Sequence, residues 1–173
     1  MKVFSSRFFK VLLSAASKSH RLRAHANVHH SYTDQCQKLF NAIQANSYIR
    51  PHRHSLDPKE ECLIAIKGLF GLIMFTDKGI IESITLFGSE KYSEKLSIAA
   101  GLEFPAGVWH TVISLEDYSI LFEVKSGPFD PSLAKEMAPW APEEGTQYAN
   151  NFFEKIKQEV LKLKSISLDT DLR

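Results

Sequence analysis

The chain has 173 residues, enough for one domain with a buried core, and 44% of them are hydrophobic. A net charge of +1 and the absence of a long basic run argue against nucleic acid as a partner. Cys36 and Cys62 are too few for a disulfide framework, which favours a reducing compartment. No stretch has the length and apolar character needed to span a bilayer. We therefore expect a cytoplasmic protein that binds neither nucleic acid nor membrane.

Residues 1–46 are predicted to form an N-terminal helical extension. The first helix is amphipathic, and charged residues interrupt its apolar runs, so it differs from a secretory signal. Its apolar face comprises Phe4, Phe8, Val11, Leu12 and Ala15. A polar loop rich in basic residues follows, and a cap at Ser31 or Thr33 then begins a second predicted helix. That helix would place on one face Cys36, Leu39, Phe40 and Ile43.

Residues 47–127 have the pattern of a β barrel. Short apolar runs alternate with turn signals, which is typical of a sandwich or barrel and not of βαβ units. The runs cover residues 62–66, 69–75, 80–87, 111–115 and 119–125. Residues 128–173 are predicted to be a proline-rich loop and a C-terminal helix that Thr146 caps. The apolar stripe of this helix comprises Ala149, Phe152, Phe153, Ile156, Val160 and Leu163. The three segments together form one structural domain.

The stretch YIRPHRHSLDPKEECLIAIKG, residues 48–68, carries a candidate metal site. His52 and His54 are two residues apart, so both imidazoles project from the same face of a strand. Two imidazoles and a nearby carboxylate suit Zn, Fe, Mn or Ni. The alternative is a solvent-facing pair of histidines in a basic loop, between Arg50 and Arg53.

A second stretch, GLEFPAGVWHTVIS at residues 101–114, places His110 at the start of an apolar strand after a tight turn at Gly107. Together the two stretches resemble the paired motifs of the cupin superfamily. The first motif corresponds to His52, His54, Glu61 and Gly68. The second corresponds to Pro105, Gly107 and His110. The resemblance implies a metal held by His52, His54, Glu61 and His110.

Two features depart from the superfamily pattern. The spacer between His54 and Glu61 is longer than usual, and Ser114 stands where the second motif ends in Asn. The long spacer leaves Glu60 as a rival ligand. Counting back from Gly68, and the alternation of side chains along the strand, both favour Glu61.

The chain also resembles the WbuC-type cupin metalloproteins, a bacterial family associated with genes for surface polysaccharide synthesis. The similarity rests on SYIRPHRH, PAGVWHTV and FEVKSGPFDP…KEMAPWAPEEG, and it extends over about residues 10–146. It implies a mainly β, single-domain cupin jelly-roll barrel with N-terminal and C-terminal flanking helices. It also implies a bound divalent transition metal, whereas it assigns no reaction.

Several other side chains are candidates for the pocket. Alternation from His52 predicts that Tyr48 and Arg50 share its face, unless Pro51 breaks the register. Arg50 and Lys125 could bind an anionic group of a ligand, and Arg23 with Arg21 could clamp a phosphate. The alternatives are that Glu123 and Lys125 face solvent on an edge strand, and that Arg21 and Arg23 are solvated or form ion pairs within the chain. Glu123 and Glu60 are the acidic candidates for a general base.

Two functions are compatible with these residues. The first is a metal-dependent enzyme, an isomerase or epimerase, a lyase or a dioxygenase, that acts on a small polar molecule such as a sugar or nucleotide-sugar. The second is a non-catalytic module that binds a ligand and acts as a sensor. A homodimer is expected because strand edges need cover.

Overall fold

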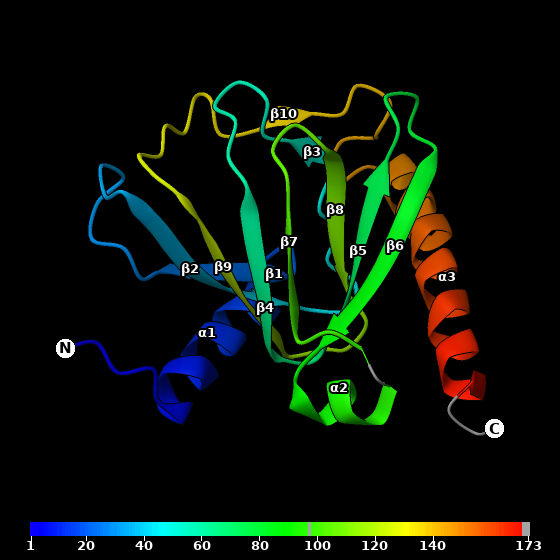
Figure 1. Ribbon diagram of the computed structural model, residues 1–173, viewed down its shortest axis with the longest axis horizontal. Coiled ribbons are helices and arrows are strands. Elements are labelled where there is room, and N and C mark those ends of the chain that lie inside the picture. Colours follow the sequence, from blue (N-terminus) through cyan, green and yellow to red (C-terminus); the bar gives the residue numbers. More distant parts are fainter. Residues whose placement is uncertain (97, 171–173) are drawn as a thin grey trace.

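Two five-stranded antiparallel sheets face each other in the computed structural model, which describes residues 1–96 and 98–170 (Figure 1). The first sheet contains, in order, β1 (Arg23–Asn27), β2 (Cys36–Ile43), β9 (Ser119–Ser126), β4 (Glu61–Lys67) and β7 (Gly101–Phe104). The second contains β10 (Glu136–Met137), β3 (His52–Arg53), β8 (Trp109–Ser114), β5 (Leu69–Phe75) and β6 (Ile81–Gly88). The mainly β architecture expected from the sequence is confirmed.

One hydrophobic core lies between the sheets, where alternate strand residues point inward. In β5, Phe70 and Leu72 enter this core, whereas Ile73 and Phe75 pack on the outer face. Because β5 is buried on both faces, its sequence is a continuous apolar run. The five strands predicted within residues 62–125 are all present, with ends shifted by at most two residues.

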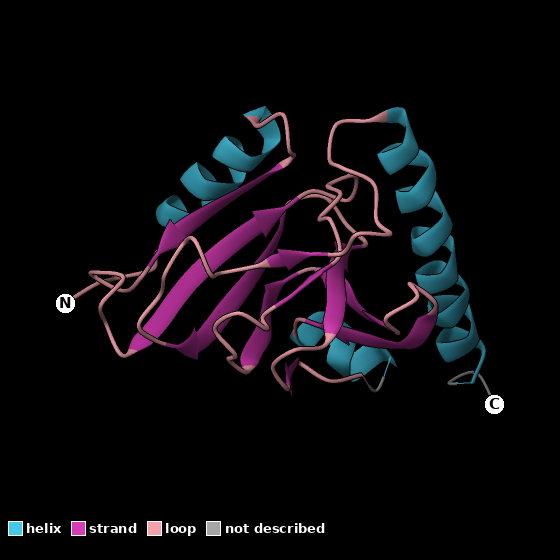
Figure 2. Cartoon of the chain, turned by 90° about the horizontal axis from the view of Figure 1, so that it is seen from above, coloured by secondary structure: helices cyan, strands magenta, loops and turns pink. Residues whose placement is uncertain are grey.

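Two helices cover the outer faces of the sheets, and a short helix, α2 (Glu90–Leu96), lies at one end (Figures 1 and 2). Helix α1 (Ser6–Lys18) packs Leu12 and Ala16 against the first sheet. Helix α3 (Gln147–Thr170) packs Phe153 and Val160 against the second. The predicted cap is confirmed, since the Ala149 amide donates to Thr146 Oγ1 at 3.1 Å.

No helix in the described part of the chain combines the length and apolar content needed to cross a membrane.

The second predicted helix is wrong, because Cys36–Ile43 forms strand β2. This strand is covered on both faces: Phe40 and Ala42 lie under α1, and Ile43 points between the sheets. Apolar residues therefore occur at both odd and even positions and imitate a helical face. The preceding basic segment, expected to be a loop, contains strand β1, which extends the first sheet.

Candidate metal centre and its cavity

Three imidazoles meet between the two sheets. His52 of β3 and His110 of β8 are directly paired across neighbouring strands, and His54 follows β3 by one residue. One ligand nitrogen from each ring lies within 4.8 Å of the others, and all three residues are buried. This arrangement could hold a metal ion.

Backbone carbonyls fix the orientation of all three rings. Nδ1 of His52 lies 2.9 Å from the Arg50 carbonyl oxygen, and Nδ1 of His110 lies 2.9 Å from that of Val108. Nδ1 of His54 is bonded in the same way to the Ala134 carbonyl. A carbonyl oxygen only accepts, so each Nδ1 carries the proton and each neutral ring presents the lone pair of Nε2. Outer hydrogen bonds of this kind orient metal-ligating histidines.

Glu61 brings a carboxylate to this cluster from β4 of the opposite sheet. Its Oε2 lies 3.0 Å from His54 Nε2 and 3.4 Å from His110 Nε2. Glu60 is exposed, so the alternation that favoured Glu61 agrees with the structure. When Nδ1 carries the proton, His54 or His110 could donate from Nε2 to Glu61 only as a charged imidazolium. A metal cation placed between the rings and Glu61 would instead be bound by the Nε2 atoms and the carboxylate oxygen together.

Lys125 lies between two carboxylates next to the cluster. Its Nζ is 3.2 Å from Glu61 Oε1 and 2.7 Å from Glu123 Oε1. Burial alone would raise the pKa of Glu61, but the charge of Lys125 and the adjacent His110 and His54 rings outweigh it and hold this pKa well below its usual range. Burial and the neighbouring Glu61 charge raise the pKa of Glu123. Asn41 Nδ2 donates to Glu123 Oε2 at 2.8 Å.

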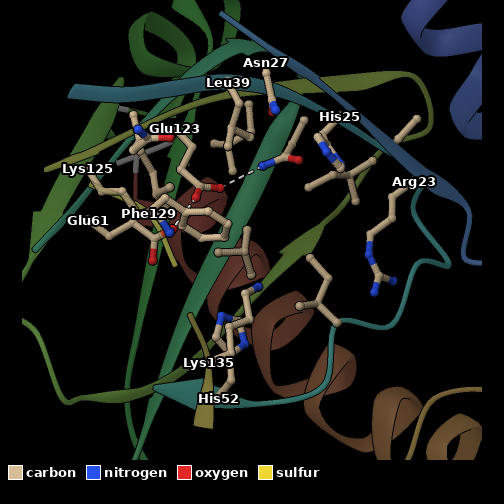
Figure 3. Close-up of a pocket in the computed structure, with 18 of the residues that line it drawn as sticks. Arg23, His25, Asn27, Leu39, His52, Glu61, Glu123, Lys125, Phe129 and Lys135 are labelled. Atoms are coloured by element: carbon tan, nitrogen blue, oxygen red, sulfur yellow. Dashed lines mark hydrogen bonds and ion pairs between the residues drawn. The ribbon is translucent and has the colours of Figure 1, made fainter. Parts of the chain in front are cut away.

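A cavity of about 480 Å³ extends from this cluster to the N-terminal strand (Figure 3). Its volume is suited to a small molecule. Arg23, His25 and Asn27 of β1 line one wall together with Ala24, while Ala26 packs toward α1. The N-terminal extension therefore forms part of the cavity wall as well as covering the barrel.

Three of the predicted pocket residues line the cavity. Lys125, Glu123 and Arg23 line the cavity. The Arg23 guanidinium is engaged by both oxygens of Glu144, at 2.6 and 2.7 Å, and by the Tyr48 carbonyl at 2.8 Å.

The prediction that Tyr48 and Arg50 share the face of His52 is wrong. The Tyr48 ring is buried beneath α3, and its hydroxyl donates to the Pro142 carbonyl at 3.0 Å. Arg50 donates to the Ala138 carbonyl at 3.0 Å and lies 3.8 Å from Glu143. Residues 48–51 are not part of a strand, so alternation does not continue through Pro51, and Ile49 lines the cavity instead. Glu60 lies beside a separate shallow depression.

Sequence reasoning missed several residues that line the cavity. Lys135 lies beside His52 (Figure 3), and its positive charge adds to burial in lowering the pKa of His52 well below the usual range. It comes from the proline-rich loop, for which no side-chain direction could be inferred. Asn41, Gln37 and His29 also line the cavity, and the first two were hidden by the incorrect helix.

Comparison with known proteins gives a match to one family model over part of the chain and similarities of fold over most of it. Residues 4–87 match a family described as a domain of unknown function, DUF6016. No curated protein matches the sequence.

Three solved structures are among those similar to this chain. Protein SO0799 from Shewanella oneidensis is 12% identical, with a TM-score of 0.50, over 65% of this chain and 72% of that one. An oxalate oxidase in complex with the substrate analogue glycolate is 9% identical, with a TM-score of 0.51, over 71% of this chain and 58% of that one. An RmlC-like cupin from Desulfovibrio desulfuricans is 13% identical, with a TM-score of 0.44, over 60% and 81%. The two antiparallel sheets and the two matches with a TM-score of at least 0.50 show that the fold of this chain is a cupin-like jelly roll.

Proposed function

We propose that His52, His54, His110 and Glu61 hold a divalent transition metal and that the chain is a metal-binding cupin with a small polar ligand. One observation supports this above all. Each of the three rings uses Nδ1 on a backbone carbonyl, so three Nε2 lone pairs converge beside a carboxylate. Such a group of acceptors is unfavourable without a cation.

The donor set fits the expected metals. Three imidazoles and one carboxylate suit Zn, Fe, Mn or Ni, and the adjoining cavity leaves coordination positions for water or ligand. When bound, the ion would polarise a ligand oxygen or lower the pKa of a bound water. The protein residues would orient the ligand, and Asn41 would hold Glu123 toward it as the candidate acid or base.

The charges in the cavity support a ligand with an anionic group. Lys125 already pairs with Glu61 and Glu123, which leaves it little capacity for a ligand anion. Lys135 forms no ion pair with any described residue and reaches the metal end of the cavity. We assign it the anion-binding role first expected for Arg50 and Lys125.

The resemblance to WbuC-type proteins extends the proposal to a sugar or nucleotide-sugar in surface polysaccharide metabolism. Purified protein would be incubated with a panel of nucleotide sugars in the metal-loaded form. Turnover that is lost in Glu123→Gln would support an enzyme. Saturable binding without turnover, weakened in Lys135→Gln, would support the alternative, a ligand-binding sensor module.

Elemental analysis of purified protein tests the metal site. Wild-type protein should contain about one metal ion per chain, and His52→Ala and His110→Ala should contain little. His30→Ala provides the matched control, since His30 is exposed and lies outside the cluster. Stoichiometric metal in both cluster variants would refute the site.

A further inference from the structure

The ring of His54 differs from the other two rings of the cluster in what holds it. Nδ1 of His52 and Nδ1 of His110 are each bonded to a carbonyl oxygen only two residues earlier in the chain. The partner of His54 Nδ1 is instead the carbonyl of Ala134, 80 residues away in the sequence. Two rings are therefore oriented by their own local backbone, whereas the third depends on the position of a separate segment.

The segment that carries Ala134 has few apolar anchors. Residues 128–137 are all described by the structure, and each of them is exposed or half-buried. Regular structure in this segment is limited to the two residues of β10, which pair with the two residues of β3. Segments with little buried apolar surface open locally at a low cost in free energy. Polar contacts of side chains therefore contribute much of what holds the Ala134 carbonyl in place.

Arg53 and Glu136 form such a contact two residues beyond Ala134. Arg53 Nε donates to Glu136 Oε2 at 2.7 Å, and a terminal nitrogen of the guanidinium donates to Oε1 at 3.0 Å. The hydroxyl of Ser55 donates to the same carboxylate. Two parallel hydrogen bonds between a guanidinium and a carboxylate fix direction as well as distance, and a lysine cannot form them.

The Arg53 guanidinium is also fixed against β8. It lies 4.2 Å from the centroid of the Trp109 ring, on the face of the second sheet that α3 covers. Trp109 directly precedes the metal-ligand candidate His110. Because Arg53 stands between His52 and His54, its side chain points away from the cluster that these two histidines face. The ion pair thus joins the Ala134 segment to the second sheet from outside the metal site.

We propose that Arg53 and Glu136 are positioning residues for His54, because their ion pair holds the Ala134 carbonyl where it accepts the His54 Nδ1 proton. This role rests on the metal centre of the proposed function, in which His54 is a ligand. The orientation of the ring can be measured without metal, so the failure of one proposal is distinguishable from the failure of the other.

The test is ¹⁵N-edited NMR of the histidine rings in the metal-free full chain, which measures how fast each Nδ1 proton exchanges with water. In Glu136→Gln and in Arg53→Met, the His54 proton should exchange about tenfold faster than in wild type, because the Ala134 segment opens more often. The protons of His52 and His110 should change by less than about twofold, since their carbonyl partners are local.

Asp77→Asn is the matched control. Asp77 lies 3.6 Å from the same guanidinium but belongs to the turn between β5 and β6, and the asparagine oxygen can still accept from Trp109 Nε1. This variant should exchange as wild type.

Two further variants test the geometry of the ion pair. Arg53→Lys keeps the charge without the two parallel hydrogen bonds, so its exchange rate should lie between those of wild type and Arg53→Met. The double variant of Arg53→Met with Glu136→Gln should exchange no faster than the faster single variant, because both changes remove the same ion pair.

Competition with a chromogenic chelator then connects the ring to the metal. Metal affinity should fall about tenfold in Glu136→Gln and stay at the wild-type value in Asp77→Asn. An Nε2–H form of His54 in wild type, unchanged exchange of its proton in both single variants, equal acceleration at all three rings, or unchanged metal affinity in Glu136→Gln would each overturn the positioning role. Faster exchange at His54 alone, in a chain whose wild type binds no metal, would instead count against the metal centre and support the role of the ion pair in orienting the ring.

Discussion

At the scale of single residues, the carboxylate of Glu61 distinguishes the metal site from three histidines alone. Glu61→Gln keeps the shape of the side chain but removes its charge. We expect metal affinity to fall by at least 10–100-fold, the range measured even for residues that only support a ligand. Glu60→Gln is the neighbouring control and should bind metal as wild type, because Glu60 is exposed. Competition with a chromogenic chelator measures both, and equal loss in the two variants would contradict the assignment.

Lys125 is the second residue whose removal should have a large effect. Burial alone would lower the pKa of its ammonium, but Glu123 and Glu61 raise it, so Lys125 is charged in the folded chain. Lys125→Met leaves two buried carboxylates without their shared cation. We expect a loss of about 3–5 kcal/mol in the free energy of unfolding, measured with urea on metal-free protein. Lys67→Met, at an exposed position of the adjoining strand, should change it by less than about 0.5 kcal/mol. A similarly small loss for Lys125→Met would mean that the ion pairs are not held in solution.

The candidate ligand residues follow from the resemblance to the cupin motifs, and the alternation of side chains along strands supported the choice of Glu61. His110 opens a strand that an apolar run predicted, after the turn at Gly107, whereas the short strand of His52 had no apolar run to mark it. Tyr48 and Arg50 were misplaced because alternation was continued through Pro51 into backbone that is not a strand. Lys135 was missed because a proline-rich loop has no periodicity from which to infer direction. Residues from irregular segments thus required the structure.

At the scale of elements, the prediction succeeded where the environment of a strand is simple. Strands β5 and β9 show apolar runs bounded by turn residues. Strand β2 is covered by α1 on one face and the cavity on the other, so its residues Gln37, Phe40, Asn41 and Ile43 satisfy both a helical and an extended pattern. No local feature of these residues favours the strand over the helix. Tertiary contacts decide it, through pairing with β1 and β9.

The packing of α3 on β5 gives a prediction at this scale. A Cβ added at Gly71 would lie 2.6 Å from Cγ1 of Val160, a fully buried residue of α3. Gly71→Ala should therefore lower the free energy of unfolding by about 1–3 kcal/mol through overpacking. Val160→Ala removes the clashing methyl groups, so the double variant should be more stable than the sum of the two single changes by at least about 0.5 kcal/mol. Urea unfolding of all four proteins provides the cycle, and strict additivity would show that α3 does not rest on Gly71.

At the scale of the whole molecule, the proposed metal would join the two sheets, since Glu61 belongs to the first, His52 and His110 belong to the second, and His54 directly follows β3. A ligand that binds only the folded chain stabilises it by about 4 kcal/mol at a thousand times its dissociation constant. For a chain of this size, chelation should then lower Tm by on the order of 10 °C. Calorimetry before and after dialysis against a chelator checks this, and readdition of metal should restore Tm. His52→Ala should show almost no response to chelation, and an equal shift in this variant would place the metal elsewhere.

The pH dependence of the free energy of unfolding should follow from the buried side chain of His52. Burial, and then the charge of Lys135, lowers the pKa of His52 in the folded chain, whereas the unfolded chain has an ordinary value near 6.5. Below about pH 6.5 the unfolded state therefore binds more protons, so stability falls as pH falls until the folded-state pKa is reached. Metal loading adds a loss of the same sign, because imidazoles must be deprotonated to bind. Urea unfolding of metal-free wild type from pH 8 to 5 should show this decline, and His52→Phe, which cannot titrate, should show a shallower one. An equally steep decline in His52→Phe would mean that other groups set the acid limit.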